Sequence, residues 1–312
     1  MSDIDSSSQD TASFPEAAVR QILARFGIDH SIELEPWPYG ESDLLARFWL
    51  DGVAHLVKGR HIEQRGARSL FETQRLQREL LANGLPVPAL LAAPSGATLI
   101  ESPDREWHYC EIQRQVPGVH LTGTAENLRR AGELIAQFHS IGAEIDTYLL
   151  NKSTYIGVFR QRGYQATQQF HAQLLAAAKT GAEQRRLNVF FARTQDPALR
   201  DFFDWRIVHG DLSSENFLID GDNLYMIDWD EVGLGPKAAD HGDILGGLPG
   251  VGEKEVRALL EGYGQGGGQL AAPELESIYN GLVRRALQRW LAEGQGTDVE
   301  VVLAAWDFVL LY

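Results

Sequence analysis

Residues 207–230 read IVHGDLSSENFLIDGDNLYMIDWD, and this stretch decides the fold. Two short apolar runs, 217–219 and 224–227, flank the turn residues Asp220-Gly221-Asp222-Asn223. The pattern predicts a β-hairpin, because Asp, Gly and Asn favour the tight turns that join antiparallel strands. Carboxylates crowd both ends of this hairpin, and the turn itself requires only two of them. The others are therefore candidates for a functional site.

Three polar side chains are predicted to converge beside the hairpin. The loop 209–216 precedes the first hairpin strand and holds Asp211 and Asn216 five residues apart. Asp228 follows the second strand, so pairing across the turn brings position 228 next to position 216. Each of these residues alone suits a cap or a turn. Together they form the oxygen-rich set that hard cations such as Mg²⁺ prefer.

The composition is that of a folded protein. The chain has 312 residues, of which 44% are hydrophobic, so it is long enough to bury substantial cores. A net charge of −15 without a basic cluster argues against a nucleic-acid partner and is compatible with a cationic substrate. No apolar run approaches the roughly 18 residues of a membrane span, and the polar start is unlike a signal peptide. We expect a cytoplasmic protein, either monomeric or homodimeric, with no membrane partner.

Hydrophobic periodicity divides the chain into a tail and two lobes. Residues 1–12 are predicted to be a disordered tail, followed by lobes over 13–115 and 116–312. The elements expected in the first lobe are a helix from Ser13, strands within 30–58 that include a hairpin with its turn at Asp51-Gly52, a helix over 66–82, and strands over 97–101 and 107–114. Those expected in the second lobe, besides the hairpin, are helices over 125–140, 155–204, 253–262 and 273–293, with a flexible connector over 262–269. The prediction is an α+β fold with a small antiparallel sheet crossed by one helix, then a larger and mostly helical lobe.

The motif in the opening stretch resembles a known family. His209-Gly210-Asp211-Leu212-x-x-x-Asn216, followed by Ile227-Asp228-Trp229-Asp230, is similar to the signature of the aminoglycoside phosphotransferase and choline kinase group. These are small-molecule kinases with a two-lobed, protein-kinase-like fold. The resemblance implies that Asp211 is the catalytic base, and that Asn216 and Asp228 hold the Mg²⁺ that bridges the phosphates of ATP.

The resemblance extends to other positions and has one departure. Members of the group commonly carry a second His where this chain has Ser213. Asp240 resembles a downstream Asp that anchors the catalytic loop by hydrogen bonding, which gives it a structural role. In this reading the segment 13–115 is the nucleotide-binding lobe, and 116–312 is the catalytic and substrate-binding lobe.

A kinase also needs a cation on the nucleotide phosphates and a carboxylate that holds this cation. Lys58 ends a predicted strand, and Glu72 lies at the margin of a helical apolar stripe, so these two form the candidate pair; Glu63 and Glu79 are alternatives for the carboxylate. Ser42, between the first two strands, is a candidate phosphate contact. The segment 111–118 is predicted to be the interlobe hinge, whose backbone binds adenine.

The acceptor is the least determined part of the prediction. Between His209 and Asp243 the sequence has nine acidic residues and one lysine, and Glu215, Asp230 and Glu231 are the candidates for binding a cationic substrate. The aromatic residues considered for cation–π contacts with such a substrate are Trp229, Tyr263, Tyr279, Trp290 and Trp306.

The alternatives for function come from three classes. An amine-bearing small molecule such as an aminoglycoside or related antibiotic is favoured, which would make the chain a resistance enzyme. Residues 84–101 and 107–119 also resemble the homoserine-kinase-like branch, so homoserine, choline and ethanolamine remain open as acceptors. A protein Ser/Thr kinase and an inactive nucleotide-binding module are the alternatives of other classes; the complete Asp211, Asn216 and Asp228 set argues against the inactive module.

Overall fold

The structure is a computed structural model of the 312-residue chain. It describes residues 16–36, 44–60, 67–102, 108–145, 172, 175–176, 178–194, 205–248, 253–271 and 274. The predictions that lie outside these residues concern the tail over 1–12, the helix start at Ser13, Ser42, Glu63, most of 155–204, the helix over 273–293, Tyr279, Trp290 and Trp306. The chain divides into two compact units: the first contains Met1–Ala67 and Ala89–Gln115, and the second contains Arg68–Pro88 and Val116–Tyr312.

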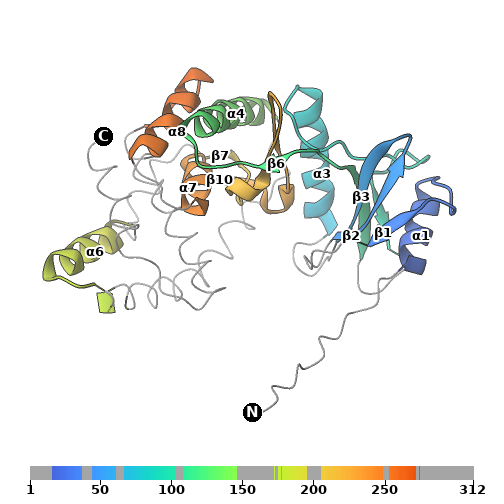
Figure 1. The fold of residues 1–312 in the computed structure, drawn as a ribbon, viewed down its shortest axis with the longest axis horizontal. Coiled ribbons are helices and arrows are strands. Elements are labelled where there is room, and N and C mark those ends of the chain that lie inside the picture. Colours follow the sequence, from blue (N-terminus) through green and yellow to red (C-terminus); the bar gives the residue numbers. More distant parts are fainter. Residues whose placement is uncertain are drawn as a thin grey trace, which may run out of the picture. The chain divides into compact units, whose positions relative to one another are not determined.

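The first unit is an antiparallel sheet with one helix packed on it (Figure 1). Its elements are α1 (Glu16–Arg25), β1 (Leu34–Pro36), β2 (Leu44–Leu50), β3 (Val53–Arg60), β4 (Leu99–Glu101) and β5 (Tyr109–Arg114), and the strand order is β1-β2-β3-β5-β4. Asp51 and Gly52 form the predicted two-residue turn between β2 and β3, and both have positive φ angles, as a tight hairpin turn requires.

The two faces of this sheet differ in character. Ile22 and Leu23 of α1 belong to one buried cluster with Phe48, Val57 and Ile112 of the strands. The register pairs Val57 with Ile112, so these two residues point to the same face, and α1 covers that face. Side chains at the alternate positions of β3, which include Lys58, point to the opposite face.

The second unit contains two small sheets and several helices. Its elements are α3 (Ala67–Ala82, all but its first residue), β6 (Val119–His120), α4 (Ala125–Glu144), α6 (Gly181–Thr194), β7 (Trp205–Val208), the 3₁₀ turn η3 (Ser214–Asn216), β8 (Phe217–Asp220), β9 (Asn223–Met226), the 3₁₀ turn η4 (Trp229–Glu231), β10 (Gly233–Pro236), α7 (Ala238–Gly247) and α8 (Glu253–Gln265). One sheet has the order β6-β8-β9, and β7 pairs with β10 in the other. Of the helices in the described ranges, none combines the length and apolar character needed to cross a bilayer.

Helix α3 buries its apolar stripe in the core of the second unit. Leu76 and Leu80 lie in the same buried cluster as Phe138 of α4 and Phe217 of β8. The connection that follows α3 is also tied to the hairpin, because the Met226 N–H donates to the Pro86 carbonyl. The 3.6-residue period predicted a buried face for this helix, and the structure identifies the core that buries it.

Helices α4 and α8 lie side by side in this unit (Figure 1), and glycines allow their backbones to approach closely. A Cβ atom built on Gly262 would lie 1.9 Å from the Arg129 carbonyl oxygen, and one built on Gly132 would lie 2.1 Å from the Leu259 oxygen. The predicted flexible connector over 262–269 is therefore wrong in its first part. Residues 262–265 are helical, and Gly262 serves close packing rather than flexibility.

Candidate active site

The predicted hairpin with its turn at 220–223 forms in the structure. Phe217 of β8 pairs with Met226 of β9, and Asp220 pairs with Asn223 across the turn. The Ile227 N–H then donates to the Asn216 carbonyl at 3.0 Å, which extends the pairing by one residue. Ile227 is therefore the residue opposite Asn216, and Asp228 follows it directly in the chain. The joint role of Asn216 and Asp228 stays a prediction.

Asn216 is hydrogen-bonded directly to Asp211. Its side-chain amide donates to the Asp211 carbonyl oxygen at 2.6 Å and to the Asp211 carboxylate at 3.3 Å. Asn216 is buried, and the Asp211 side chain is only partly buried. Because the Asn216 NH₂ group is used within the loop, its amide oxygen is the atom that remains to coordinate a cation.

Asp228 has an unusual backbone conformation. Its φ and ψ angles are 60° and 66°, in the left-handed region that non-glycine residues rarely adopt. Asp228 precedes η4, but its side chain makes no capping hydrogen bond to that turn. A residue held in this region costs of order 1–3 kcal/mol, and such strain gathers at functional sites. The left-handed conformation turns the backbone sharply at Asp228, the residue that the sequence predicts to be a metal ligand.

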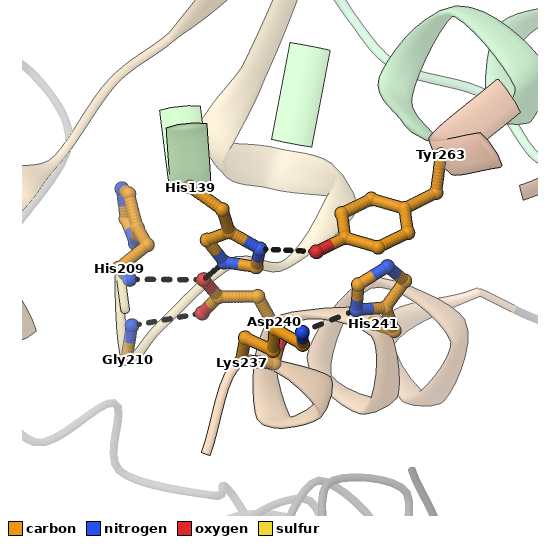
Figure 2. Close-up of polar contacts among 7 residues, drawn as sticks. All are labelled: His139, His209, Gly210, Lys237, Asp240, His241 and Tyr263. Atoms are coloured by element: carbon orange, nitrogen blue, oxygen red, sulfur yellow. Dashed lines mark hydrogen bonds and ion pairs between the residues drawn. The ribbon is translucent and has the colours of Figure 1, made fainter. Parts of the chain in front are cut away.

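The loop that carries Asp211 is anchored by Asp240 of α7, as the sequence predicts (Figure 2). The His209 N–H donates to Asp240 Oδ2 and the Gly210 N–H to Asp240 Oδ1, both at 3.1 Å. Gly210 has a φ angle of 80°, which a side chain would disfavour. The His209 ring also contacts the Ile227 carbonyl oxygen through Nε2 at 2.9 Å. The loop is thus fixed to both α7 and the end of the hairpin.

Asp240 is fully buried, and its pKa is nevertheless lowered. Burial acts to raise the pKa of Asp240, but the hydrogen bond and electrostatic attraction from His139, together with the charge and backbone N–H of His209, outweigh burial. His139 of α4 reaches Asp240 Oδ2 through Nε2 at 3.0 Å. Asp240 is therefore a carboxylate at neutral pH, and it accepts hydrogen bonds from three groups.

The contacts continue beyond His139 into α8 and α7 (Figure 2). His139 Nδ1 lies 3.0 Å from the Tyr263 hydroxyl, and the His241 ring meets the Tyr263 ring edge to face at 4.3 Å. His241 Nδ1–H donates to the Lys237 carbonyl at 3.3 Å. Burial, with repulsion from His139, lowers the pKa of His241 to about 3, so its ring is neutral near pH 7.

Two of the aromatic residues considered for substrate binding are core residues instead. Tyr263 and Trp229 are each 3% exposed. The Trp229 ring packs edge to face on Phe138 and also lies 4.8 Å from the His209 ring. Neither presents an open ring face to a cation. The hypothesis that these two rings bind substrate is therefore wrong.

The acidic surface is smaller than the sequence suggests. Asp240 and Asp243 are completely buried, and Lys237 lies 3.5 Å from Glu274. The three carboxylates predicted to bind a cationic substrate are more accessible: Glu215 on η3 and Glu231 on η4 are exposed, and Asp230 on η4 is partly buried. Their role in substrate binding stays a prediction.

The predicted phosphate-binding pair is divided between the two units. Lys58 of β3 is 7% exposed and belongs to the first unit, whereas Glu72 of α3 is 9% exposed and belongs to the second. A β-bulge lies directly across from Lys58, where the register with β2 shifts between Leu44 and Ala46; bulges are frequent beside active sites. The Lys58–Glu72 pair stays a prediction.

The structure separates Glu72 from its alternative Glu79. Glu79 is partly buried and pairs with Arg75 at 2.9 Å, one helical turn away, whereas Glu72 is buried. The predicted hinge over 111–118 begins inside strand β5, which continues to Arg114. Only residues 115–118 form the connection between β5 and β6.

The donors at the end of the hairpin are of the kind that a divalent cation takes. Asn216 would supply an amide oxygen and Asp228 a carboxylate, and both are ligands that Mg²⁺ favours. No group of three or more His, Cys, Asp or Glu side chains in the described ranges has the geometry of a complete metal site. Two protein ligands suit Mg²⁺ that is shared with the phosphates of a nucleotide.

Sequence reasoning missed the residues that support Asp240. His139, Tyr263 and His241 are buried and contact one another, yet they come from three different helices. The one available signal was a histidine within the apolar stripe of α4, four residues after Ile135. A polar residue on a buried stripe requires a hydrogen-bond partner, and here the partner is Asp240.

Several solved kinase structures are similar to this chain in fold. The structure of amicoumacin kinase hAmiN in complex with AMP-PNP, Ca²⁺ and Ami is similar over 95% of this chain and 94% of that chain, with 15% identity and a TM-score of 0.64. A microcompartment-associated aminopropanol kinase covers 94% of each chain, with 15% identity and a TM-score of 0.67. An aminoglycoside phosphotransferase from Alicyclobacillus acidocaldarius subsp. acidocaldarius DSM 446 covers 99% of this chain and 94% of that chain, with 15% identity and a TM-score of 0.65.

These similarities confirm the predicted α+β, protein-kinase-like fold. No curated protein sequence matches the chain significantly. A model of the phosphotransferase enzyme family, in contrast, matches residues 44–278, well over half of the chain, and this range includes the loop and the hairpin. The predicted enzyme class, a phosphotransferase with an alcohol group as acceptor, agrees with this match. The chain belongs to the phosphotransferase enzyme family.

Proposed function

We propose that this protein transfers the γ-phosphate of ATP to a hydroxyl group of an amine-bearing small molecule. The observation that carries the proposal is the presence of Asp211, Asn216 and Asp228 in one loop-and-hairpin unit. Asn216 donates to Asp211, and the Ile227 N–H, one residue before Asp228, donates to the Asn216 carbonyl. Enzymes of this class act mainly by positioning groups and neutralising charge, and this unit provides a base and two cation ligands together.

Each of these residues has a distinct part in the proposed reaction. Asp211 accepts the proton of the acceptor hydroxyl while the hydroxyl oxygen attacks the γ-phosphorus. The bond from that phosphorus to the β,γ-bridging oxygen then breaks, and ADP leaves. Asn216 and Asp228 hold Mg²⁺, which would neutralise the phosphate oxygens when bound. Lys58, paired with Glu72, binds the phosphates of ATP, with Ser42 as a further contact. The backbone near the end of β5 binds adenine.

Related structures support both the nucleotide and the kind of acceptor. One is described as amicoumacin kinase with AMP-PNP, Ca²⁺ and Ami, and another as spectinomycin phosphotransferase with ADP and spectinomycin. A third is named an aminopropanol kinase, whose substrate by its name carries an amine and a hydroxyl. We therefore propose ATP with Mg²⁺ as the phosphate donor, and the cytoplasm as the compartment that supplies it.

The acceptor we favour is an aminoglycoside or related antibiotic. Glu215 lies in the catalytic loop, Asp230 and Glu231 follow the hairpin, and all three keep part of their surface accessible. Carboxylates in these positions attract ammonium groups to the hydroxyl acceptor site. Homoserine, choline and ethanolamine kinases are the alternatives within the same chemistry, and each predicts a different preferred acceptor.

The proposal is tested by measuring ADP release from Mg-ATP over a panel of acceptors. The panel includes aminoglycosides, spectinomycin, aminopropanol, choline, ethanolamine, homoserine and casein, and mass spectrometry identifies the phosphorylated product. We expect turnover with at least one amine-bearing alcohol. Turnover with casein alone would indicate a protein kinase. Binding of ATP without turnover on any acceptor would indicate a nucleotide-binding module.

The metal assignment has its own test. Asn tolerates the left-handed backbone that Asp228 adopts, so Asp228→Asn keeps the fold but loses the anionic ligand. We expect the Mg²⁺ concentration for half-maximal rate to rise about tenfold or more, the consequence of losing about 1.4 kcal/mol or more of metal binding. An exposed turn carboxylate of the same hairpin provides the matched control, Asp222→Asn. An unchanged Mg²⁺ dependence in Asp228→Asn would remove this residue from the metal site.

A further inference from the structure

Three charged side chains are buried on the same face of the sheet in the first unit. Lys58 and Arg60 of β3 and Glu111 of β5 are 7%, 8% and 3% exposed. Lys58 and Arg60 are two residues apart in an extended strand, so they point to one face. The β3–β5 register places Glu111 directly opposite Lys58, so its side chain belongs to that face as well.

Glu111 is held in place by Arg60. The Arg60 guanidinium donates to Glu111 Oε1 in an ion pair whose side chains are 10% and 4% exposed. Residues directly opposite in an antiparallel pair have Cβ atoms about 4.5–5.5 Å apart, which brings the Glu111 carboxylate within reach of the Lys58 ammonium. One carboxylate thus pairs with Arg60 and has Lys58 opposite it in the neighbouring strand, and the three residues carry a net charge of +1.

Stability alone does not account for this arrangement. Burying a charged pair costs desolvation energy, and replacing such a pair with apolar residues of similar size is often neutral or stabilising. The opposite face of the same sheet is packed with apolar side chains, among them Phe48 and Val57, so apolar residues are compatible with the strands. A lysine side chain, in contrast, loses about 2 kcal/mol of rotamer freedom when it is held in one position, and a fixed carboxylate offsets that cost.

We propose that Glu111 is a positioning residue that holds the Lys58 ammonium for the phosphates of a nucleoside triphosphate, with Arg60 fixing the carboxylate. This inference rests on the proposed function and adds a carboxylate from the sheet itself to the predicted Lys58–Glu72 pair. In this proposal Lys58, Arg60 and Glu111 of the first unit together determine the preference for a polyphosphate. The net charge of +1 on that face is then available to the phosphate oxygens.

The test measures the Kd of Mg-ATP by calorimetry and the KM of ATP against kcat, with the free energy of unfolding measured in parallel. Glu111→Gln leaves Arg60 buried without its ion pair, so this variant loses stability as well as affinity. The double variant Arg60→Met/Glu111→Met removes both charges. We expect the double variant to regain stability but to bind Mg-ATP about tenfold or more weakly, the loss of one charge-assisted interaction.

A cycle with Lys58 separates positioning from a general effect. If Glu111 acts through Lys58, the Arg60→Met/Glu111→Met change should alter the Kd less than about twofold in a Lys58→Ala background. The matched control is Glu35→Gln, which breaks the partly exposed Arg47–Glu35 ion pair of the same sheet, and it should bind Mg-ATP as the unaltered protein does.

Two results would overturn the inference. One is unaltered Mg-ATP affinity in the Arg60→Met/Glu111→Met variant, which would mean that Glu111 only neutralises Arg60. The other is a further tenfold loss of affinity when the same change is made in the Lys58→Ala background. The Kd and unfolding measurements need no acceptor, so an unaltered protein that binds Mg-ATP but phosphorylates nothing would overturn the proposed function and leave this inference standing.

Discussion

Asp240 fixes the catalytic loop through the number and kind of its hydrogen bonds. Both carboxylate oxygens accept a backbone N–H from the loop, at His209 and at Gly210, and Oδ2 also contacts His139. Hydrogen bonds to an ionised acceptor are about twice as strong as neutral ones, and their strength rises further in a buried environment. A single side chain thereby sets the backbone that presents Asp211.

Replacing Asp240 by asparagine tests this anchoring. In the Asp240→Asn variant the side-chain amide keeps one acceptor oxygen but turns an NH₂ group toward a donor, so at least one loop N–H loses its partner. We expect kcat to fall about tenfold or more, the free energy of unfolding to fall by about 3 kcal/mol, and the Kd of Mg-ATP to change little. Steady-state kinetics and urea unfolding check this. Unchanged kcat in Asp240→Asn would show that the loop does not depend on this anchor.

His241 makes stability depend on pH. Its pKa is about 3 in the folded protein and 6.5 in the reference state, so between these values the unfolded chain binds the proton and the folded chain does not. Stability is therefore lost as the pH falls from about 6.5 toward 3, with a limiting slope of about 1.4 kcal/mol per pH unit. The lowered pKa of Asp240 affects stability below its reference value of 3.8, outside the upper part of this window.

The variant His241→Phe keeps a ring against Tyr263 and removes the titration. We expect its free energy of unfolding to decline less steeply than that of the unaltered protein between pH 6.5 and 4.5. Urea unfolding at several pH values in this range provides the measurement. The exposed His30 gives the control variant His30→Gln, which should keep the original slope. Parallel curves for His241→Phe and the unaltered protein would contradict the assignment.

At the scale of elements, the close contact of α4 and α8 brings His139 and Tyr263 together. The two residues are 124 positions apart in sequence, and their side chains meet at 3.0 Å. The contact depends on Gly132 and Gly262, where the backbone of the facing helix occupies the space that a side chain would take. The support of Asp240 therefore extends to helix packing well removed from the catalytic loop.

Two glycines of α8 provide a matched test of that packing. A Cβ atom at Gly262 would lie 1.9 Å from a backbone oxygen of α4, whereas one at Gly264 has nothing within 4 Å. We expect Gly262→Ala to lower the free energy of unfolding by about 2 kcal/mol or more, because the helices must separate. Gly264→Ala should raise it by up to about 1 kcal/mol through helix propensity. Thermal or urea unfolding distinguishes them, and equal effects would contradict the proposed role of Gly262.

The sequence predicted the elements whose signals are local. The Asp51-Gly52 and Asp220–Asn223 turns follow from residue types that adopt tight turns, and pairing across the second turn places Asn216 opposite Ile227, one residue before Asp228. The Asp240 anchor was predicted from a family motif. The two turns and the pairing across the second one could be predicted because they involve residues close together in the sequence.

Other features required tertiary packing and were missed or misjudged. Glycine favours both flexible segments and close helix contacts, so the stretch from Gly262 was interpreted as a connector although it begins inside α8. Trp229 and Tyr263 are residue types that can bind a cation on their rings, but both are buried in the core of the second unit. The apolar stripe of α3 indicated burial without identifying the core that Leu76 enters.

At the scale of the whole molecule, the predicted machinery is divided between two compact units. The first unit carries the buried charges Lys58, Arg60 and Glu111 on one sheet face, and the second carries Asp211, Asn216 and Asp228 in its loop and hairpin. We propose that the first group binds the nucleotide phosphates and that the second accepts the proton and holds the metal. Phosphoryl transfer requires both groups of residues.

The most direct test of the central claim is acceptor-dependent ADP formation by the Asp211→Asn variant. Loss of the base predicts a fall in kcat of about a hundredfold or more, with little change in the Kd of Mg-ATP or in the free energy of unfolding. The exposed turn residue gives the control Asp220→Asn, which should keep full activity. Full turnover by Asp211→Asn would contradict the assignment of Asp211 as the base and, with it, the account of this loop as the site of phosphoryl transfer.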